Sequence, residues 1–188
     1  MQGTARKVIT RIYGNGRGWA FSPKDFLDIG SRSSIDKALS VLRRKGTIRR
    51  VCRGIYDYPR SSKALNMEAP PDLNQVAHAI ARSRGWTIQA SGLWAANLLG
   101  VSTQVPAHVV YLSDGPRMSC EIGGRKIEFK PVAPKDLDAG KCGLIIQALR
   151  ACGKNGVDDK TIAYLRRNIS PKNCRKLLAK RHVTTWVY

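Results

Sequence analysis

Acidic residues are scarce in this chain. Its 188 residues include 13 Asp and Glu against 33 Lys and Arg, which gives a formal net charge of +20. Solubility requires a much smaller excess, so a polyanionic partner is the first to consider. Residues 1–62 hold 14 basic and 4 acidic side chains and residues 141–188 hold 11 and 2, whereas residues 63–140 hold 8 and 7. The excess charge therefore lies at both ends of the chain.

Patterns typical of disulfide frameworks and metal sites are missing. The five cysteines are odd in number and form no Cys-x-x-Cys pair, and the three histidines are isolated from one another. This spacing predicts reduced, mostly buried thiols rather than a disulfide scaffold or a zinc site. We expect no cofactor and no metal.

Long apolar runs are missing as well. No stretch approaches the roughly 18 apolar residues that cross a bilayer, and residues 1–7 lack the apolar core of a signal peptide. We therefore expect a cytoplasmic protein with no membrane partner.

The first sixty residues carry the spacing of helices followed by a hairpin. An apolar face predicts a first helix that ends at the glycine-rich loop 14–18, and residues 22–25 have the composition of a helix start that opens a second, short helix. Ser33 and Asp36 are expected to cap a third helix. Its buried stripe is predicted to consist of Ile35, Ala38, Leu39 and Leu42.

Two short β-rich runs, Thr47–Val51 and Gly54–Tyr58, follow the third helix and predict a hairpin. The order of helix, helix, turn, helix and hairpin is typical of a winged helix-turn-helix domain. Basic residues crowd the helix end and the hairpin, which favours binding to double-stranded DNA over a merely solvated basic face. The candidate DNA-binding residues here are Arg32, Ser33, Ser34, Lys37, Ser40, Arg44, Arg49, Arg50 and Arg53.

These assignments predict an α+β protein in two parts. A winged helix-turn-helix domain is expected over 1–62, a linker over 63–71 and an α+β domain over 72–188. The second domain is expected to hold a helix that begins after Asp72, a strand over 86–89, a helix over 91–99 and three further strands. The expected ranges of these strands are 109–112, 118–122 and 126–130.

The C-terminal domain is expected to end in basic helices. A last helix that opens at Ser170 and Pro171 would place Lys172, Arg175 and Lys176 on its outer surface, together with Lys180 and Arg181. We expect these residues to make sequence-independent contacts with phosphates. A solvated helix face is an equally simple interpretation.

Three residues also fit an enzymatic alternative, a metal-dependent nuclease. Metal-dependent nucleases place an acid and a Glu-x-Lys pair on adjacent strands, and Asp114 with Glu128 and Lys130 fits that pattern. The pattern is short, and an amphipathic strand with alternating charges generates it by chance. Asp114 also precedes Gly115 and Pro116, a sequence typical of a turn. We therefore expect a non-enzymatic protein and keep a nuclease as the alternative.

A family resemblance is carried by residues 21–26, 30–32, 38–39, Leu42, 45–46, 48–50, 53–56, 58–59, 91–106, 111–113 and 127–130. These stretches resemble the AbiEi-like antitoxins of bacterial type IV toxin–antitoxin and abortive-infection systems. The resemblance implies a transcriptional repressor that binds an operator upstream of its own gene. It also implies a nucleotidyltransferase-like toxin as a functional partner, countered without a stable complex.

Overall fold

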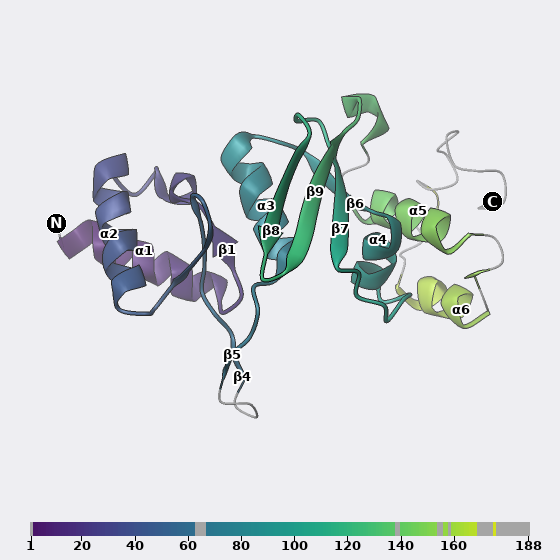
Figure 1. Cartoon of the computed structure of the whole chain (residues 1–188), viewed down its shortest axis with the longest axis horizontal. Helices are drawn as coiled ribbons and strands as arrows, with labels where there is room; N and C mark the ends of the chain where they lie inside the picture. The colour runs from purple at the N-terminus through teal and green to yellow at the C-terminus, as the bar shows by residue number, and fades with distance from the viewer. Residues whose placement is uncertain are drawn as a thin grey trace. The chain divides into compact units, whose positions relative to one another are not determined.

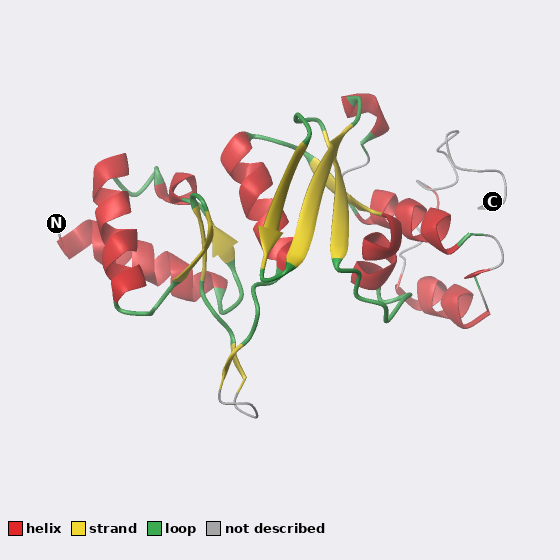
Figure 2. Ribbon diagram, viewed as in Figure 1, coloured by secondary structure: helices red, strands yellow, loops and turns green. Residues whose placement is uncertain are grey.

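The computed structural model describes residues 2–62, 67–137, 140–153, 156–157, 159–168 and 175. These residues form a mixed α+β structure (Figures 1 and 2). They divide into two compact units. The first comprises the described part of Met1–Trp86 with Cys120–Gly124, and the second comprises Thr87–Ser119 with the described part of Arg125–Tyr188.

The first unit begins with helices that pack on a small sheet. Its elements in chain order are α1 (Gln2–Asn15), β1 (Ala20–Phe21), the 3₁₀ helix η1 (Pro23–Phe26), α2 (Arg32–Arg44), β2 (Arg49–Cys52), β3 (Ile55–Asp57), β4 (Ser61–Ser62), β5 (Met67–Glu68) and α3 (Leu73–Arg84). Antiparallel pairing gives the strand order β1-β3-β2, and β4 pairs with β5 in a separate ribbon.

The core of the first unit forms where the apolar faces of α1 and α2 meet. Val8 and Ile12 of α1 are fully buried, and they share one cluster with Phe21 and Phe26 and with α2. The predicted stripe of α2 is confirmed, because its four members are buried in the same cluster. Apolar residues three or four positions apart lie on one face of a helix, so the local sequence determines which side of α2 is buried.

The helix starts differ in detail from those predicted. The start at Ser22 is confirmed, because the Asp25 carboxylate accepts hydrogen bonds from the backbone N–H and the hydroxyl of Ser22, but it opens a 3₁₀ helix rather than an α-helix. The prediction that Ser33 caps the third helix is wrong. Ser31 caps α2, because its hydroxyl accepts a hydrogen bond from the Ser34 backbone N–H. The helix therefore begins at Arg32, whose side chain forms an ion pair with Asp36 one turn further along.

Helix α3 belongs to the first unit by its contacts, whereas the sequence analysis assigned it to the second domain. The Arg82 guanidinium donates to the Asp25 carboxylate at 2.9 Å and to the Ala20 carbonyl at 2.9 Å, and Lys24 donates to the Ser83 carbonyl. The predicted cap is confirmed, because Asp72 accepts from two backbone N–H groups at the helix start. The predicted linker includes β5, which pairs with β4.

The larger sheet has the strand order β6-β7-β9-β8. Strands β6, β7 and β9 belong to the second unit, and β8 lies at the boundary between the two units in the sequence. Strand β7 runs antiparallel to β6 and parallel to β9, which places His108 opposite Lys126 and Ser113 opposite Pro131. The strand predicted over 86–89 is shifted, since β6 covers Ile88–Ser91. The sheet strands and the elements after them are β6 (Ile88–Ser91), α4 (Gly92–Leu99), β7 (His108–Ser113), β8 (Met118–Ile122), β9 (Arg125–Pro131), η2 (Pro134–Asp136), α5 (Lys141–Cys152) and α6 (Asp159–Asn168).

Polar groups inside the second unit are satisfied by one another. The Trp94 indole donates to the Tyr111 hydroxyl at 2.7 Å, and the Gln89 amide donates to the Gly143 carbonyl at 2.9 Å. These bonds join α4 and α5 to the sheet and leave the second unit a packed core. Among the described residues, no helix has the length and apolarity to cross a membrane.

Candidate nucleic-acid interface

Arginines neutralise the acidic residues of the described part of residues 2–86, which makes up most of the first unit. Each Asp or Glu among the described residues of 2–86 lies close to a guanidinium, at distances from 2.6 to 3.6 Å. The pairs are Arg11 with Asp28, Arg32 with Asp36, Arg49 with Asp57 and Glu68, Arg60 with Asp72, and Arg82 with Asp25. The remaining cations of this unit therefore have no carboxylate partner among the described residues.

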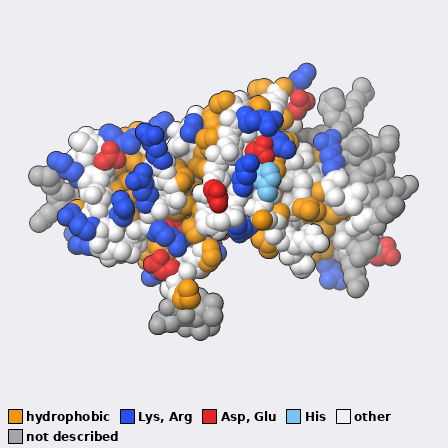
Figure 3. Space-filling model, in the orientation of Figure 1, with side chains coloured by type: hydrophobic (Ala, Val, Ile, Leu, Met, Phe, Trp, Pro, Cys, Tyr) orange, Lys and Arg blue, Asp and Glu red, His pale blue; other side chains and the backbone are white. Residues whose placement is uncertain are grey.

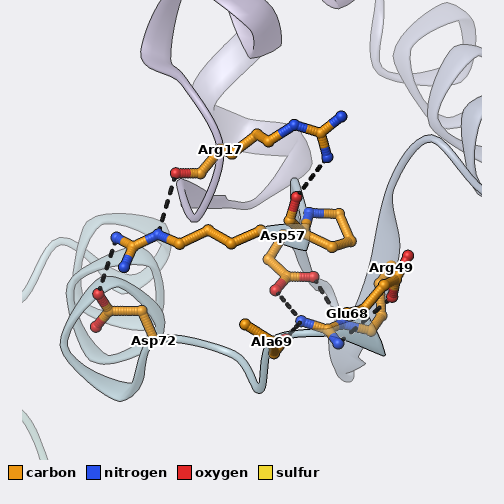
Figure 4. Close-up of polar contacts among 8 residues, drawn as sticks. Arg17, Arg49, Asp57, Glu68, Ala69 and Asp72 are labelled. Carbon is orange, nitrogen blue, oxygen red and sulfur yellow. Dashed lines mark hydrogen bonds and ion pairs between the residues drawn. The ribbon is translucent and has the colours of Figure 1, made fainter. Parts of the chain in front are cut away.

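Arg49, predicted to contact DNA, lies in the most buried of these pairs (Figure 4). Its guanidinium donates to both oxygens of Asp57, at 3.1 and 2.6 Å, and to the Ala69 carbonyl at 3.1 Å. The Asp57 side chain is only 2% exposed and that of Arg49 is 28% exposed. The hydrogen bond to Asp57 raises the pKa of Arg49 above its ordinary value. These contacts support a structural role for Arg49.

A second set of contacts joins the glycine-rich loop to the chain after β3 (Figure 4). Arg17 donates to the Pro59 carbonyl at 2.9 Å and its guanidinium lies 4.8 Å from the Tyr58 ring centroid. Arg60 donates to the Arg17 carbonyl and pairs with Asp72. Two arginines thus hold the glycine-rich loop against the chain after β3, which supports a structural role for this loop.

The candidates at the start of α2 make local contacts. Arg32 pairs with Asp36 at 2.9 Å, and the Ser33 and Ser34 hydroxyls lie 3.2 and 2.9 Å from that of Ser31. Both partners of the ion pair are at least half exposed, so water weakens it and a ligand can replace it at little cost.

The outward face of α2 carries the other candidates from this helix. Lys37, Ser40 and Arg44 are exposed and lie opposite the buried stripe. Two exposed cations that were not among the candidates, Arg43 and Lys45, lie beside Arg44. The sequence shows that these residues are basic, but only the bounds of α2 show that three consecutive cations, residues 43–45, lie at its C-terminal end.

The β2–β3 hairpin extends this basic surface. Arg50 and Arg53 are exposed, and Arg50 donates only to the Cys52 carbonyl among the described groups, at 3.4 Å. Figure 3 shows many basic side chains over the part of the first unit that holds α1, α2 and the hairpin. We define the basic surface as the cations of α2 and the hairpin that lack a carboxylate partner among the described residues: Lys37, Arg43, Arg44, Lys45, Arg50 and Arg53.

The predicted C-terminal contacts fall mostly beyond the described residues. Lys172, Lys176, Lys180 and Arg181 lie outside them, and Arg175 is described and exposed. The second basic surface therefore remains a prediction.

Two of the three residues of the nuclease alternative, Asp114 and Glu128, make structural contacts in the second unit. Asp114 accepts from the Thr87 backbone N–H at 2.9 Å, in the turn after β7. Glu128 pairs with His108 at 2.9 Å and with Arg117 at 3.3 Å. Lys130 is partly exposed on β9. Among the described residues, no three His, Cys, Asp or Glu side chains are grouped so that they could hold a metal ion.

The described cysteines are free thiols, and one of them is suited to a direct test. Burial raises the pKa of the Cys120 thiol to about 11. Because iodoacetamide reacts with the thiolate, we expect Cys120 to react at pH 8 about a hundredfold more slowly than an unhindered thiol. Timed quenching and peptide mass spectrometry measure this rate. A rate equal to that of glutathione would contradict the burial of this residue.

Comparison with known proteins places the chain in a family. A search of curated proteins found no match. The model of the protein family DUF6088 matches residues 7–177. This family is described as one of unknown function. Because this match covers both units and most of the sequence, the chain belongs to the DUF6088 family.

Proposed function

We propose that this protein is a sequence-specific DNA-binding transcriptional repressor. In this proposal the segment from α1 to β3 is a winged helix-turn-helix domain, α2 is its recognition helix and the β2–β3 hairpin is its wing. Double-stranded DNA is the polyanionic partner that we propose for the net charge of +20.

The order of elements supports the winged-helix assignment. Helix α1, strand β1, η1, α2 and the β2–β3 hairpin follow one another, and β1 adds to the hairpin in the order β1-β3-β2. A helix-turn-helix uses its second helix to read the major groove, and α2 occupies that position. An exposed hairpin directly after this helix is suited to lie along the phosphate backbone.

The observation that carries the proposal is the pairing of charges in the first unit. The described acids of residues 2–86 are all matched by arginines, and the basic surface consists of cations left over on two consecutive elements. A cluster of like charges without counter-charges destabilises a folded protein by self-repulsion. DNA removes this cost, because phosphates neutralise the cations and release condensed counterions.

Sequence reading is proposed for the outward face of α2. Lys37, Ser40 and Arg44 have side chains that hydrogen-bond base edges, and none of them has a carboxylate partner among the described residues. Arg32 would exchange its exposed pair with Asp36 for a base or a phosphate. The hairpin cations Arg50 and Arg53 would contact phosphates without reading sequence.

The specific test is the substitution Lys37→Ala. We expect it to weaken binding to the operator by about fivefold or more, which is the discrimination expected of one good base contact, and to change binding to random DNA much less. Gel-shift titrations with both DNAs measure the two losses. Lys7→Ala, which removes an exposed lysine from α1, is the matched control. Equal losses on both DNAs would contradict the assignment of Lys37 to base reading.

The regulated gene is proposed from the resemblance to AbiEi-like antitoxins. Its implication is autoregulation, so the DNA upstream of this protein's own gene is the first operator to test. A nucleotidyltransferase-like toxin encoded nearby would be the functional partner, acting without a stable complex. If every upstream fragment shifts at the same protein concentration as random DNA, the proposal is reduced to unspecific DNA binding.

A further inference from the structure

The first unit contains an apolar groove between its two main helices. The groove has a volume of about 440 Å³ and is lined by α1 and α2. By floor we mean its apolar lining, which consists of Ala5 and Ile9 from α1 and of Ala38, Val41 and Leu42 from α2. This volume falls in the range of small-molecule sites, which are also lined mostly by apolar side chains.

Val41 is the feature of the floor that the fold does not explain. Its side chain is 39% exposed, whereas Ala38 and Leu42 beside it are nearly buried. A valine at this edge of α2 exposes apolar surface to water without adding to the core cluster. An apolar ligand in the groove would cover it, and removing that surface from water favours binding.

The rim of the groove is cationic. By rim we mean the three cations of its lining, which are Arg6 of α1, Lys37 of α2 and Lys45 directly after α2. All three are exposed and lack a carboxylate partner among the described residues. Lys37 and Lys45 lie eight positions apart, or about 12 Å along the helix, so the positive charge borders the groove along its length. A negatively charged group is attracted to this rim, and a cation is repelled.

Together these features identify the occupant by its chemistry. Nucleic-acid phosphates satisfy the rim but are too polar to cover the apolar floor, whereas a neutral apolar molecule leaves the rim unmatched. We propose that the groove binds a small amphiphilic anion, with its apolar body against Val41 and its carboxylate or equivalent group at the cationic rim.

The site also gives the ligand a route to regulation, and this step rests on the proposed function. Lys37 belongs both to the rim and to the basic surface assigned to DNA. An anion at this rim competes with DNA for the same charge, so binding of one ligand weakens binding of the other to an equal degree. The amphiphile is then an inducer that releases the operator.

The experiment uses decanoate with the full-length chain. Titration followed by amide chemical shifts in ¹H–¹⁵N NMR spectra is expected to show saturable changes confined to α1 and α2 around the groove. Decan-1-ol, with the same chain and no charge, is expected to bind at least about fivefold more weakly because it leaves the cationic rim unpaired. Changes spread over the whole surface, or equal affinities for the two compounds, would overturn the proposal.

Matched pairs of variants locate the site. Val41→Glu places a negative charge on the floor and is expected to weaken decanoate binding about tenfold or more, whereas Leu27→Glu alters a residue that is 50% exposed and does not line the groove. Arg6→Gln is expected to cost about two- to fivefold and Lys7→Gln nothing, since only Arg6 lines the rim. Thermal unfolding verifies that each variant is folded. Wild-type affinity in Val41→Glu would refute the site.

Two further outcomes separate this inference from the proposed function. Decanoate binding in the groove by a protein that does not bind DNA would leave the ligand site intact and refute the repressor. DNA binding that is unchanged at saturating decanoate would refute the inducer role. Sedimentation at several concentrations tests the competing occupant: a dimer that Val41→Glu dissociates would show that a second copy fills the groove, and would overturn the proposal.

Discussion

Replacing Arg49 by Ala is expected to destabilise the protein by about 3 kcal/mol, although Arg49 belongs to the most basic part of the sequence. The substitution leaves the Asp57 carboxylate buried and without its two charge-assisted hydrogen bonds. A buried charge without a partner retains its desolvation cost and loses the attraction that offset it. Urea unfolding followed by circular dichroism measures the change in the free energy of unfolding.

The control for this prediction is Arg53→Ala, which removes the same side chain from an exposed position of the same hairpin. We expect a change within about 0.5 kcal/mol. The double variant Arg49→Met, Asp57→Leu is expected to recover most of the stability, since it removes both charges and keeps apolar volume. An Arg49→Ala variant as stable as Arg53→Ala would mean that the pair contributes nothing to folding and would return Arg49 to the candidates for DNA contact.

Removing three cations from the basic surface is expected to lower affinity for all DNA about a hundredfold at 0.15 M salt. The variant is Arg43→Ala, Arg50→Ala, Arg53→Ala, which leaves the residues assigned to base reading unchanged. Each lost phosphate contact lowers the slope of log K against log salt by about 0.9, so the three together lower it by about 2.7. Titrations of a random-sequence duplex at four salt concentrations measure the slope.

A triple variant with the same loss of charge separates contact from net charge. Lys7→Ala, Lys126→Ala, Lys135→Ala removes three exposed lysines that lie off the basic surface. We expect its salt slope to stay close to that of the wild type, because counterion release counts the phosphates in contact with the protein rather than its overall charge. If the two triple variants lose the same slope, the basic surface is a solvated face and DNA binding does not depend on it.

The parts of this fold that could be predicted depend on the spacing of residues close together in the sequence. The buried stripe of α2 and the cap at Asp72 are both confirmed, because each depends on residues within one or two helical turns. The turn at Gly123 and Gly124 between β8 and β9 is of the same kind: both residues have positive φ values, 56° and 74°, which glycine adopts without strain. The mixed α+β class follows from these elements.

Pairings between distant segments could not be predicted in this way. Strand β9 follows β8 by a tight turn, yet it also pairs with β7 in parallel, and nothing in the spacing of either strand indicates that neighbour. Strand β1 is only two residues long and exists because β3 offers it an edge. Helix α3 joins the first unit through Arg82, which reaches Asp25 57 positions earlier.

The candidate site divides along the same line. The sequence by itself determined that both ends of the chain are basic and which residues of α2 face outward, because charge is a property of composition and orientation follows from helical spacing. Only the tertiary structure decided that Arg49 is committed to Asp57 and that Val41 lies in a groove beside Arg6. Which carboxylate neutralises which arginine, and which apolar side chain stays uncovered, depends on the surfaces that meet when helices and strands pack, and these contacts join residues that no local spacing relates.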